Sequence, residues 1–237
     1  MSMTPNVVLE GRILFQNEAC MVINKRAGES SESDWGAAEG GGRKFPAPVH
    51  RLDTPVSGCL LLAKTPEAAA FLGAAFARHD SQVIKHYWAI IEKPPASAGF
   101  RAEAELVHWL SENRKLNKAF AAPWSEGPPP QKGRGTPPKK AVLRYRTLGQ
   151  GDHYLFLEID LVTGRHHQIR AQLAARGLHI KGDLKYGARR SDRTGCIRLH
   201  AYSLAFPDPL NPGGIIEVKA LPPEMDPLWT AFGEAVL

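Results

Sequence analysis

The segment that most constrains this chain is HRLDTPVSG, residues 50–58, which runs directly into the apolar residues 59–63. The residues after Asp53 are mainly turn-forming types, namely Thr, Pro, Ser and Gly, so Asp53 is expected at the edge between a strand and a loop. Such an edge holds a side chain firmly and leaves it accessible to a ligand. Asp53 is therefore a candidate reactive group; the alternative is that its carboxylate caps the turn by accepting a backbone N–H.

Length and composition indicate a folded protein without a membrane-spanning segment. A chain of 237 residues, 43% of them apolar, can bury a substantial core without a metal or disulfides. The longest apolar runs have about five residues, far fewer than a bilayer requires, and the first residues lack the pattern of a secretory signal. We therefore expect no membrane association and a cytoplasmic location.

The charge balance favours a polyanionic partner. The formal net charge is +6 and the sequence pI is about 9.3, and a basic surface raises both encounter rate and affinity for phosphate backbones. Cys20, Cys59 and Cys196 are widely spaced and odd in number, which argues against a disulfide framework and against a zinc site. We predict that they are small buried residues.

Hydrophobic patterning predicts short strands interleaved with a few helices. Alternating or β-branched apolar runs predict strands at residues 7–14, 20–24, 82–92, 101–109, 142–148, 154–162 and 215–219. Helical spacing predicts helices at residues 66–79, 163–177 and 226–236. In the first of these, Thr65 is the expected N-cap, and the predicted core face consists of Ala68, Phe71, Leu72, Ala75 and Phe76.

Two segments have the composition of loops. Residues 28–48 are rich in Gly, Ser, Glu and Pro, which predicts a flexible loop, either a lid or a plain connector. Residues 111–140 are rich in Pro, Gly, Lys and Arg, which predicts a long loop or insertion without a helix or a central strand. The basic residues of this insertion either contact an RNA backbone or belong to a solvated linker.

Several motifs together resemble those of the RluA-type pseudouridine synthases. HRLDTPVSG resembles the family signature HRLD-x-x-TSG, KHYWA at residues 85–89 resembles K-x-Y-x-A, and TGRHHQIR at residues 163–170 resembles TGR-x-HQIR. KGDLKYG at 181–187 and LHA at 199–201 follow in the family order. The resemblance implies an α+β fold: a bent mixed or mainly antiparallel sheet flanked by helices, with a central cleft. It also implies one catalytic domain, residues 1–237, without the N-terminal RNA-binding domain of many relatives.

The same resemblance implies roles for the site residues. Asp53 is the nucleophile, Arg165 pairs with it, and Tyr87 lies against the target base, with removal of the C5 proton left open as a further role. A guanidinium within about 4–6 Å of a carboxylate favours its ionised form and fixes its orientation. Arg51 takes the place that the extruded base leaves. The predicted substrate-binding residues are His50, Arg51, Leu52, His167, Gln168, Arg170 and Leu199.

The chain departs from the family pattern at two positions. Val56 stands where the family usually has Thr, which removes a hydroxyl near the turn, and Gln172 stands where many relatives have His. His166 and His167 could suggest a metal, but we predict that adjacent histidines at a helix start point apart, and no further ligand lies at metal spacing. We therefore expect no metal site.

The implied reaction is the isomerisation of a specific uridine to pseudouridine in structured RNA, ribosomal or transfer RNA. The uracil is extruded from its stack, and Asp53 attacks ribose C1′ or base C6. No cofactor is expected, because the leaving and entering groups belong to one base. RNA is the expected partner, with no obligate protein partner and a monomeric enzyme. The alternative is a non-catalytic RNA-binding protein that has kept the synthase fold, against which the joint presence of Asp53, Tyr87 and Arg165 argues.

Overall fold

The computed structural model describes residues 9–33, 35, 45–78, 82–95, 99–129 and 137–236. The chain divides into two compact units: residues 1–86 with 200–225, and residues 87–199 with 226–237. It passes between them three times: within the strand β5 (Ile84–Glu92), within the strand β10 (Leu199–Pro207), and between residues 225 and 226. The single catalytic domain predicted from the sequence stays a prediction.

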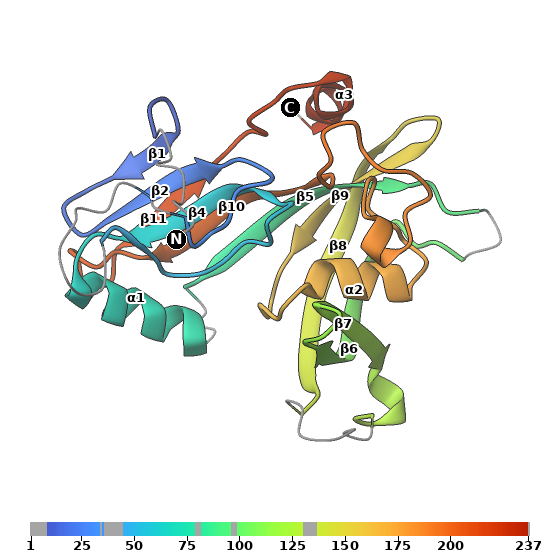
Figure 1. Cartoon of the computed structure of the whole chain (residues 1–237), viewed down its shortest axis with the longest axis horizontal. Helices are drawn as coiled ribbons and strands as arrows, with labels where there is room; N and C mark the ends of the chain where they lie inside the picture. The colour runs from blue at the N-terminus through green and yellow to red at the C-terminus, as the bar shows by residue number, and fades with distance from the viewer. Residues whose placement is uncertain are drawn as a thin grey trace. The chain divides into compact units, whose positions relative to one another are not determined.

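The first unit is built on a mixed sheet (Figure 1). Besides β10, its strands are β1 (Ile13–Gln16), β2 (Cys20–Lys25), β3 (Ala47–Pro48), β4 (Ser57–Ala63) and β11 (Ile215–Lys219). The order is β1-β2-β4-β10, with β3 on β4 and β11 on β10. β4 and β10 run parallel, whereas the other pairs in this sheet are antiparallel.

Helix α1 (Pro66–Arg78) covers one face of this sheet, as predicted. The Thr65 hydroxyl accepts the Ala68 N–H at 3.2 Å and so caps the helix. The buried stripe, Ala68, Leu72 and Ala75, has the spacing i, i+4, i+7, and Leu72 packs into the main core of this unit. Phe71 was predicted on the core face but is 48% exposed, because it lies at the flank of this narrow stripe. The other members of the core are Cys20, Val22, Cys59, Leu61, Leu204, Phe206, Val218 and Ala220.

The second unit contains the strand order β5-β9-β8-β6-β7. These strands are β6 (Glu103–Asn113), β7 (Lys118–Pro123), β8 (Lys139–Gln150) and β9 (Tyr154–Asp160), and each neighbouring pair from β9 to β7 is antiparallel. Helix α2 (Gln168–Ala175) lies on this sheet (Figure 1). It shares a core cluster with β6, β7 and β8 that consists of Leu110, Ala119, Ala141, Ala171 and Tyr186.

Helix α3 (Pro227–Val236) closes the second unit. The Asp226 carboxylate caps it by accepting the N–H groups of Leu228 and Trp229, both at 3.1 Å. Phe232 is fully buried, with its ring centroid 4.7 Å from that of Trp88. Trp88 is therefore a packing residue, as its position opposite Tyr87 in the strand predicted. None of the helices within the described ranges is long and apolar enough to cross a membrane.

Two segments predicted as loops are more structured than their composition suggested. Within residues 111–140 the structure forms strand β7, because KAFAAP is largely apolar and lies at a sheet edge, where Pro123 ends the strand without breaking a ladder. Within residues 28–48, Ser31 and Trp35 are buried and β3 forms. Residues 34, 36–44 and 130–136 lie outside the described residues.

The first predicted strand, residues 7–14, is displaced along the chain. Residues 7 and 8 lie outside the described ranges, and the Arg12 N–H donates to the Leu9 carbonyl in a turn, so the strand begins at Ile13.

Candidate active site

In the first unit Asp53 lies at the turn that leads into β4. Its carbonyl accepts the Val56 N–H at 2.9 Å, which closes the turn. Ser57 and Gly58 were predicted in this turn but are the first residues of β4. Leu52 and Val56 are 5% and 2% exposed, whereas Asp53 is half-buried. The side chain of Asp53 is thus carried by a backbone that buried residues anchor on both sides.

Gly58 is required by a close approach of two backbones. Its φ is +115°, and a Cβ at this position would lie 2.2 Å from the Ala201 carbonyl oxygen of β10. The two residues are partners in the parallel pairing of β4 with β10. Only glycine fits this geometry, which explains the last residue of HRLDTPVSG.

Ser31 holds the residue immediately before Asp53. Its hydroxyl accepts the Leu52 N–H and donates to the Leu52 carbonyl, both at 2.9 Å. Ser31 is 5% exposed, and its own carbonyl accepts the Trp35 indole N–H at 3.0 Å. One buried hydroxyl therefore satisfies both backbone groups of Leu52.

Lys25 holds the residue immediately after Asp53. Its ammonium is fully buried and donates to the Thr54 carbonyl at 3.3 Å and to the Glu29 carbonyl at 2.8 Å. The Gly28 N–H donates to the same Thr54 carbonyl at 2.7 Å. Sequence analysis missed this support; the available signal was a lysine at the end of the apolar strand CMVIN, since a buried ammonium needs several acceptors.

His50 ties the start of the motif to β4 and α1. Its Nε2 accepts the Leu61 N–H at 3.1 Å, and its ring stacks on Phe76 with centroids 5.0 Å apart. Burial, followed by the charge of Lys85, lowers the pKa of His50 to about 3, so the ring is neutral at physiological pH. His50 thus positions the motif, and the substrate-binding roles predicted for His50, the buried Leu52 and the exposed Arg51 stay predictions.

A buried hydroxyl stands next to the position where this chain lacks the family threonine. Ser57 Oγ lies 2.9 Å from His200 Nδ1, and His200 Nε2 lies 2.9 Å from the Ala220 carbonyl. A carbonyl only accepts, so Nε2 carries the proton and Nδ1 accepts from Ser57. Burial lowers the pKa of His200 to about 4, which keeps it neutral in this role. Val56 itself contributes apolar packing.

In the second unit the TGR segment forms a loop, and α2 begins at Gln168 instead of Thr163. The Gln168 side chain explains the difference. Its Oε1 accepts the Thr163 hydroxyl at 2.8 Å and the Arg165 N–H at 2.9 Å, while its Nε2 donates to the Val142 carbonyl at 3.1 Å. The first residue of the helix therefore supplies hydrogen-bond partners for the polar groups of the loop before it. One of these hydrogen bonds fixes the backbone of Arg165. Arg165 itself is half-buried, and its Nε donates to the Lys140 carbonyl at 3.4 Å.

We predicted that the two histidines of this loop point apart, and this prediction is wrong. His167 has a left-handed backbone with φ of +51°, and this turn brings its ring onto that of His166, with centroids 3.8 Å apart. His167 Nδ1 lies 3.0 Å from the Tyr186 hydroxyl. Burial, followed by the charges of Arg170, His166 and Lys185, lowers the pKa of His167 to about 3, so this ring is neutral.

Arg170 anchors α2 to the KGDLKYG segment. It forms a two-point ion pair with Asp183 at 2.7 and 2.8 Å, and the two side chains are 5% and 1% exposed. The guanidinium also lies 4.9 Å from the centre of the Tyr186 ring, in η3 (Leu184–Tyr186). His167, Gln168 and Arg170 therefore have internal partners, and direct RNA binding by them stays a prediction.

Gln172, the second departure from the family, ties α2 to β6 and β8. Its Nε2 donates to the Leu106 and Ala141 carbonyls at 3.0 and 3.2 Å and lies 3.1 Å from His108 Nδ1. The amide is fully buried, and its Oε1 has no hydrogen-bond partner within the part of the chain that the structure describes.

The remaining predicted residues are buried strand residues. Tyr87 in β5 is 7% exposed, and Leu199, the first residue of β10, is 3% exposed. Asp53 belongs to the first unit and Tyr87 and Arg165 to the second, so the Asp53–Arg165 pair and the role of Tyr87 beside the base stay predictions.

Comparison with known proteins defines the class. Residues 20–175 match the family model described as RNA pseudouridylate synthase, and the chain belongs to this family. It is of the RluA type that its motifs predicted. An uncharacterized RNA pseudouridine synthase of Zymomonas mobilis is 32% identical over 83% of this chain and 88% of the relative. Ribosomal large subunit pseudouridine synthase D of the same species is 28% identical (92% and 71%), and tRNA pseudouridine synthase C of Haemophilus ducreyi is 27% identical (95% and 97%).

Solved structures agree on the fold. Human RNA pseudouridylate synthase domain containing 1 has a TM-score of 0.71 at 23% identity, covering 98% of this chain and 90% of the human chain. Domain containing 4 has a TM-score of 0.66 at 19% identity, covering 96% and 94%. The predicted α+β fold is thus confirmed. The chain is an isomerase that converts uridine to pseudouridine in RNA, and the comparisons give no support to the non-catalytic alternative.

Proposed function

We propose that Asp53 is the nucleophile of this isomerisation. The observation that carries the proposal is the double support of its backbone: Ser31 holds Leu52 on one side and Lys25 holds Thr54 on the other. Asp53 itself is half-buried at the turn between them. A reactive group benefits from a backbone that cannot move during attack, because misplacement by about 1 Å costs orders of magnitude in rate.

The proposed reaction needs no group beyond the RNA and the protein side chains. After extrusion of the target uracil, the Asp53 carboxylate attacks ribose C1′ or base C6, and the C1′–N1 bond breaks. The base then turns, C5 bonds to C1′, and the bond from Asp53 to C1′ or C6 breaks, which releases the carboxylate. C5 then loses its proton and N1 gains one, so the nucleotide keeps its composition. The proposal gives Arg165 the role of pairing with Asp53 and Tyr87 that of supporting the base. Arg51, an exposed residue of the same motif, takes the place that the extruded base leaves in the stack.

The proposal also covers the RNA substrate, the oligomeric state and the cellular location. The relatives act, by their names, on large-subunit ribosomal RNA and on transfer RNA, so one specific uridine of either RNA is the proposed target. A cytoplasmic monomer without a protein partner is part of the proposal. Pseudouridine mapping in cells with and without the gene identifies the target, and size-exclusion chromatography with light scattering tests the monomer.

The direct test is Asp53→Asn, assayed for pseudouridine formation in RNA from cells that lack the gene. We expect turnover to be lost while RNA binding remains, since the change removes the nucleophile and little volume. Asp152→Asn, at an exposed turn position, is the matched control and should retain activity. Equal activity of the two variants would exclude Asp53 as the nucleophile.

A further inference from the structure

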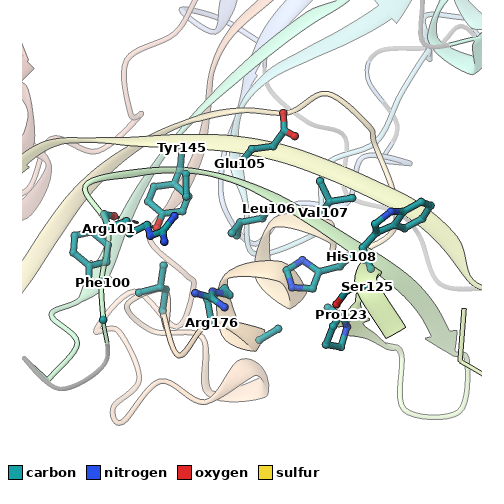
Figure 2. A pocket seen from close by; sticks show the side chains of 16 residues that line it. Phe100, Arg101, Glu105, Leu106, Val107, His108, Pro123, Ser125, Tyr145 and Arg176 are labelled. Carbon is teal, nitrogen blue, oxygen red and sulfur yellow. Dashed lines mark hydrogen bonds between the residues drawn. The ribbon is translucent and has the colours of Figure 1, made fainter. Parts of the chain in front are cut away.

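A cavity of about 570 Å³ lies wholly within the second unit, at the C-terminal end of α2 (Figure 2). Its volume falls within the range of ligand sites, roughly 300–1,000 Å³. Arg165 precedes the other end of this eight-residue helix, about 12 Å away at 1.5 Å per residue. The cavity is thus separate from the TGR segment. Among its lining residues are Phe100, Arg101, Glu105, His108, Tyr145 and Arg176.

The cavity offers positive charge. Arg101 and Arg176 are exposed lining residues, and neither side chain is bonded to a carboxylate among the residues that the structure describes. Glu105, the single acidic residue among the described lining residues, is paired with Arg144 at 2.8 Å. Figure 2 shows the Arg176 guanidinium between the Tyr145 end of the cavity and His108. An anionic group in the middle of the cavity would meet Arg176 directly.

One end of the cavity has aromatic walls. The Phe100 and Tyr145 rings stack with centroids 6.3 Å apart and an interplanar angle of 19°. The Tyr145 hydroxyl donates to the Arg101 carbonyl at 3.1 Å, which fixes this ring. Phe100 is half-buried, so part of its ring remains accessible. Accessible aromatic rings beside arginine are the usual surface on which proteins stack unpaired bases.

His108 supplies a fixed donor. His108 is 8% exposed, and its Nδ1 lies 3.1 Å from Gln172 Nε2. Because that Gln172 atom also contacts two carbonyls, it is the amide nitrogen, which donates and does not accept. Its two hydrogens are shared among three acceptors, of which His108 Nδ1 is one, so the His108 proton is on Nε2. This Nε2–H has no hydrogen-bond partner within the described ranges. His108 lines the cavity, so this fixed donor is available to an acceptor that enters the cavity.

We propose that this cavity binds one unpaired nucleotide of the RNA substrate, at a position other than the target uridine. The base stacks on Phe100, its phosphate pairs with Arg176 and Arg101, and an acceptor on the nucleotide receives the His108 Nε2–H. The proposal rests on the RNA substrate of the enzyme and does not depend on the role of Asp53. Gln172, where many relatives have histidine, then serves to orient His108.

The test measures RNA binding in the Asp53→Asn protein, so that binding is separated from turnover. The probes are a transcript containing the mapped target and, in a second arm, uridine monophosphate. We expect Phe100→Leu combined with Arg176→Gln to weaken binding of the transcript about tenfold. With Asp53 restored, KM should rise and kcat should stay unchanged. Arg146→Gln is the matched control, because Arg146 is an exposed β8 residue outside the lining.

Cross-linking supplies an independent measurement. A transcript carrying photoreactive uridines at unpaired positions should cross-link to the peptide that contains Phe100, and His108→Gln should reduce that yield. Transcript binding equal to that of the Arg146→Gln protein would overturn the proposal. So would tight binding of the mononucleotide with unchanged transcript binding, which would make the cavity a site for a free nucleotide.

Discussion

The HRLD turn of the first unit and the TGRHHQIR segment of the second unit are held in different ways. Asp53 is fixed partly from outside its motif, by Ser31 and Lys25 acting on the neighbouring backbone groups. Arg165 is fixed from inside its motif, by the side chain of Gln168, while Arg170 anchors the helix that follows. The TGRHHQIR segment therefore contains the side chain that holds its arginine, whereas the HRLD turn also depends on hydrogen bonds from residues outside it.

The largest expected effect concerns the first region. Gly58→Ala should abolish folding, with a loss of about 5 kcal/mol or more, because the new Cβ would overlap the Ala201 backbone at positive φ. Gly73→Ala, inside α1 with open space around it, is the matched control and should be neutral or stabilising. Thermal unfolding of both proteins measures their stability. A stable, active Gly58→Ala protein would show that the close approach of β4 and β10 is not required.

The next effect concerns the second region. Arg170→Met leaves the Asp183 carboxylate buried without its partner and should lower the free energy of unfolding by about 3–5 kcal/mol. Arg144→Met breaks the exposed pair with Glu105 and should cost at most about 1 kcal/mol. Chemical denaturation measures both. Similar losses in the two variants would mean that the Arg170–Asp183 pair does not hold α2.

A smaller effect tests external support of Asp53. Ser31→Ala leaves two buried backbone groups of Leu52 unpaired and should cost about 1–3 kcal/mol. We expect kcat to fall and KM to change little, because the turn loosens while the RNA surface is kept. Ser33→Ala, whose hydroxyl donates to Ser30 at an exposed site, is the control. Equal kcat values for both variants would remove the positioning role.

The smallest effect is a pH dependence. The folded-state pKa of His200, about 4, lies below its ordinary value of 6.5, so the unfolded chain binds more protons between these values. Its contribution to stability is full above pH 6.5 and is lost as the pH falls toward 4. His200→Asn should therefore flatten the decline of Tm across this window. The exposed His153→Asn protein is the control, and an identical slope in both variants would contradict the neutral imidazole beside Ser57.

Local patterns in the sequence were enough to identify the family motifs, the helices α1 and α3, and the packing role of Trp88. Period, capping residues and turn types act over a few residues, and a short window of sequence contains them. The same window misplaced Phe71 on the core face and extended α2 back to Thr163, since the width of a buried stripe and the loop held by Gln168 depend on what packs against them.

Only the tertiary structure decided how the motifs are supported. Ser31 and Leu52 are 21 positions apart, and Ser57 and His200 are 143 apart, and nothing in a local pattern specifies such partners. The strand β7, the stacked rings of His166 and His167, and the cavity beside His108 likewise depend on neighbours that folding brings together. The predicted catalytic residues thus lie in motifs that can be recognised in the sequence. Their positions in the folded protein depend on hydrogen bonds between buried groups that are far apart in the sequence.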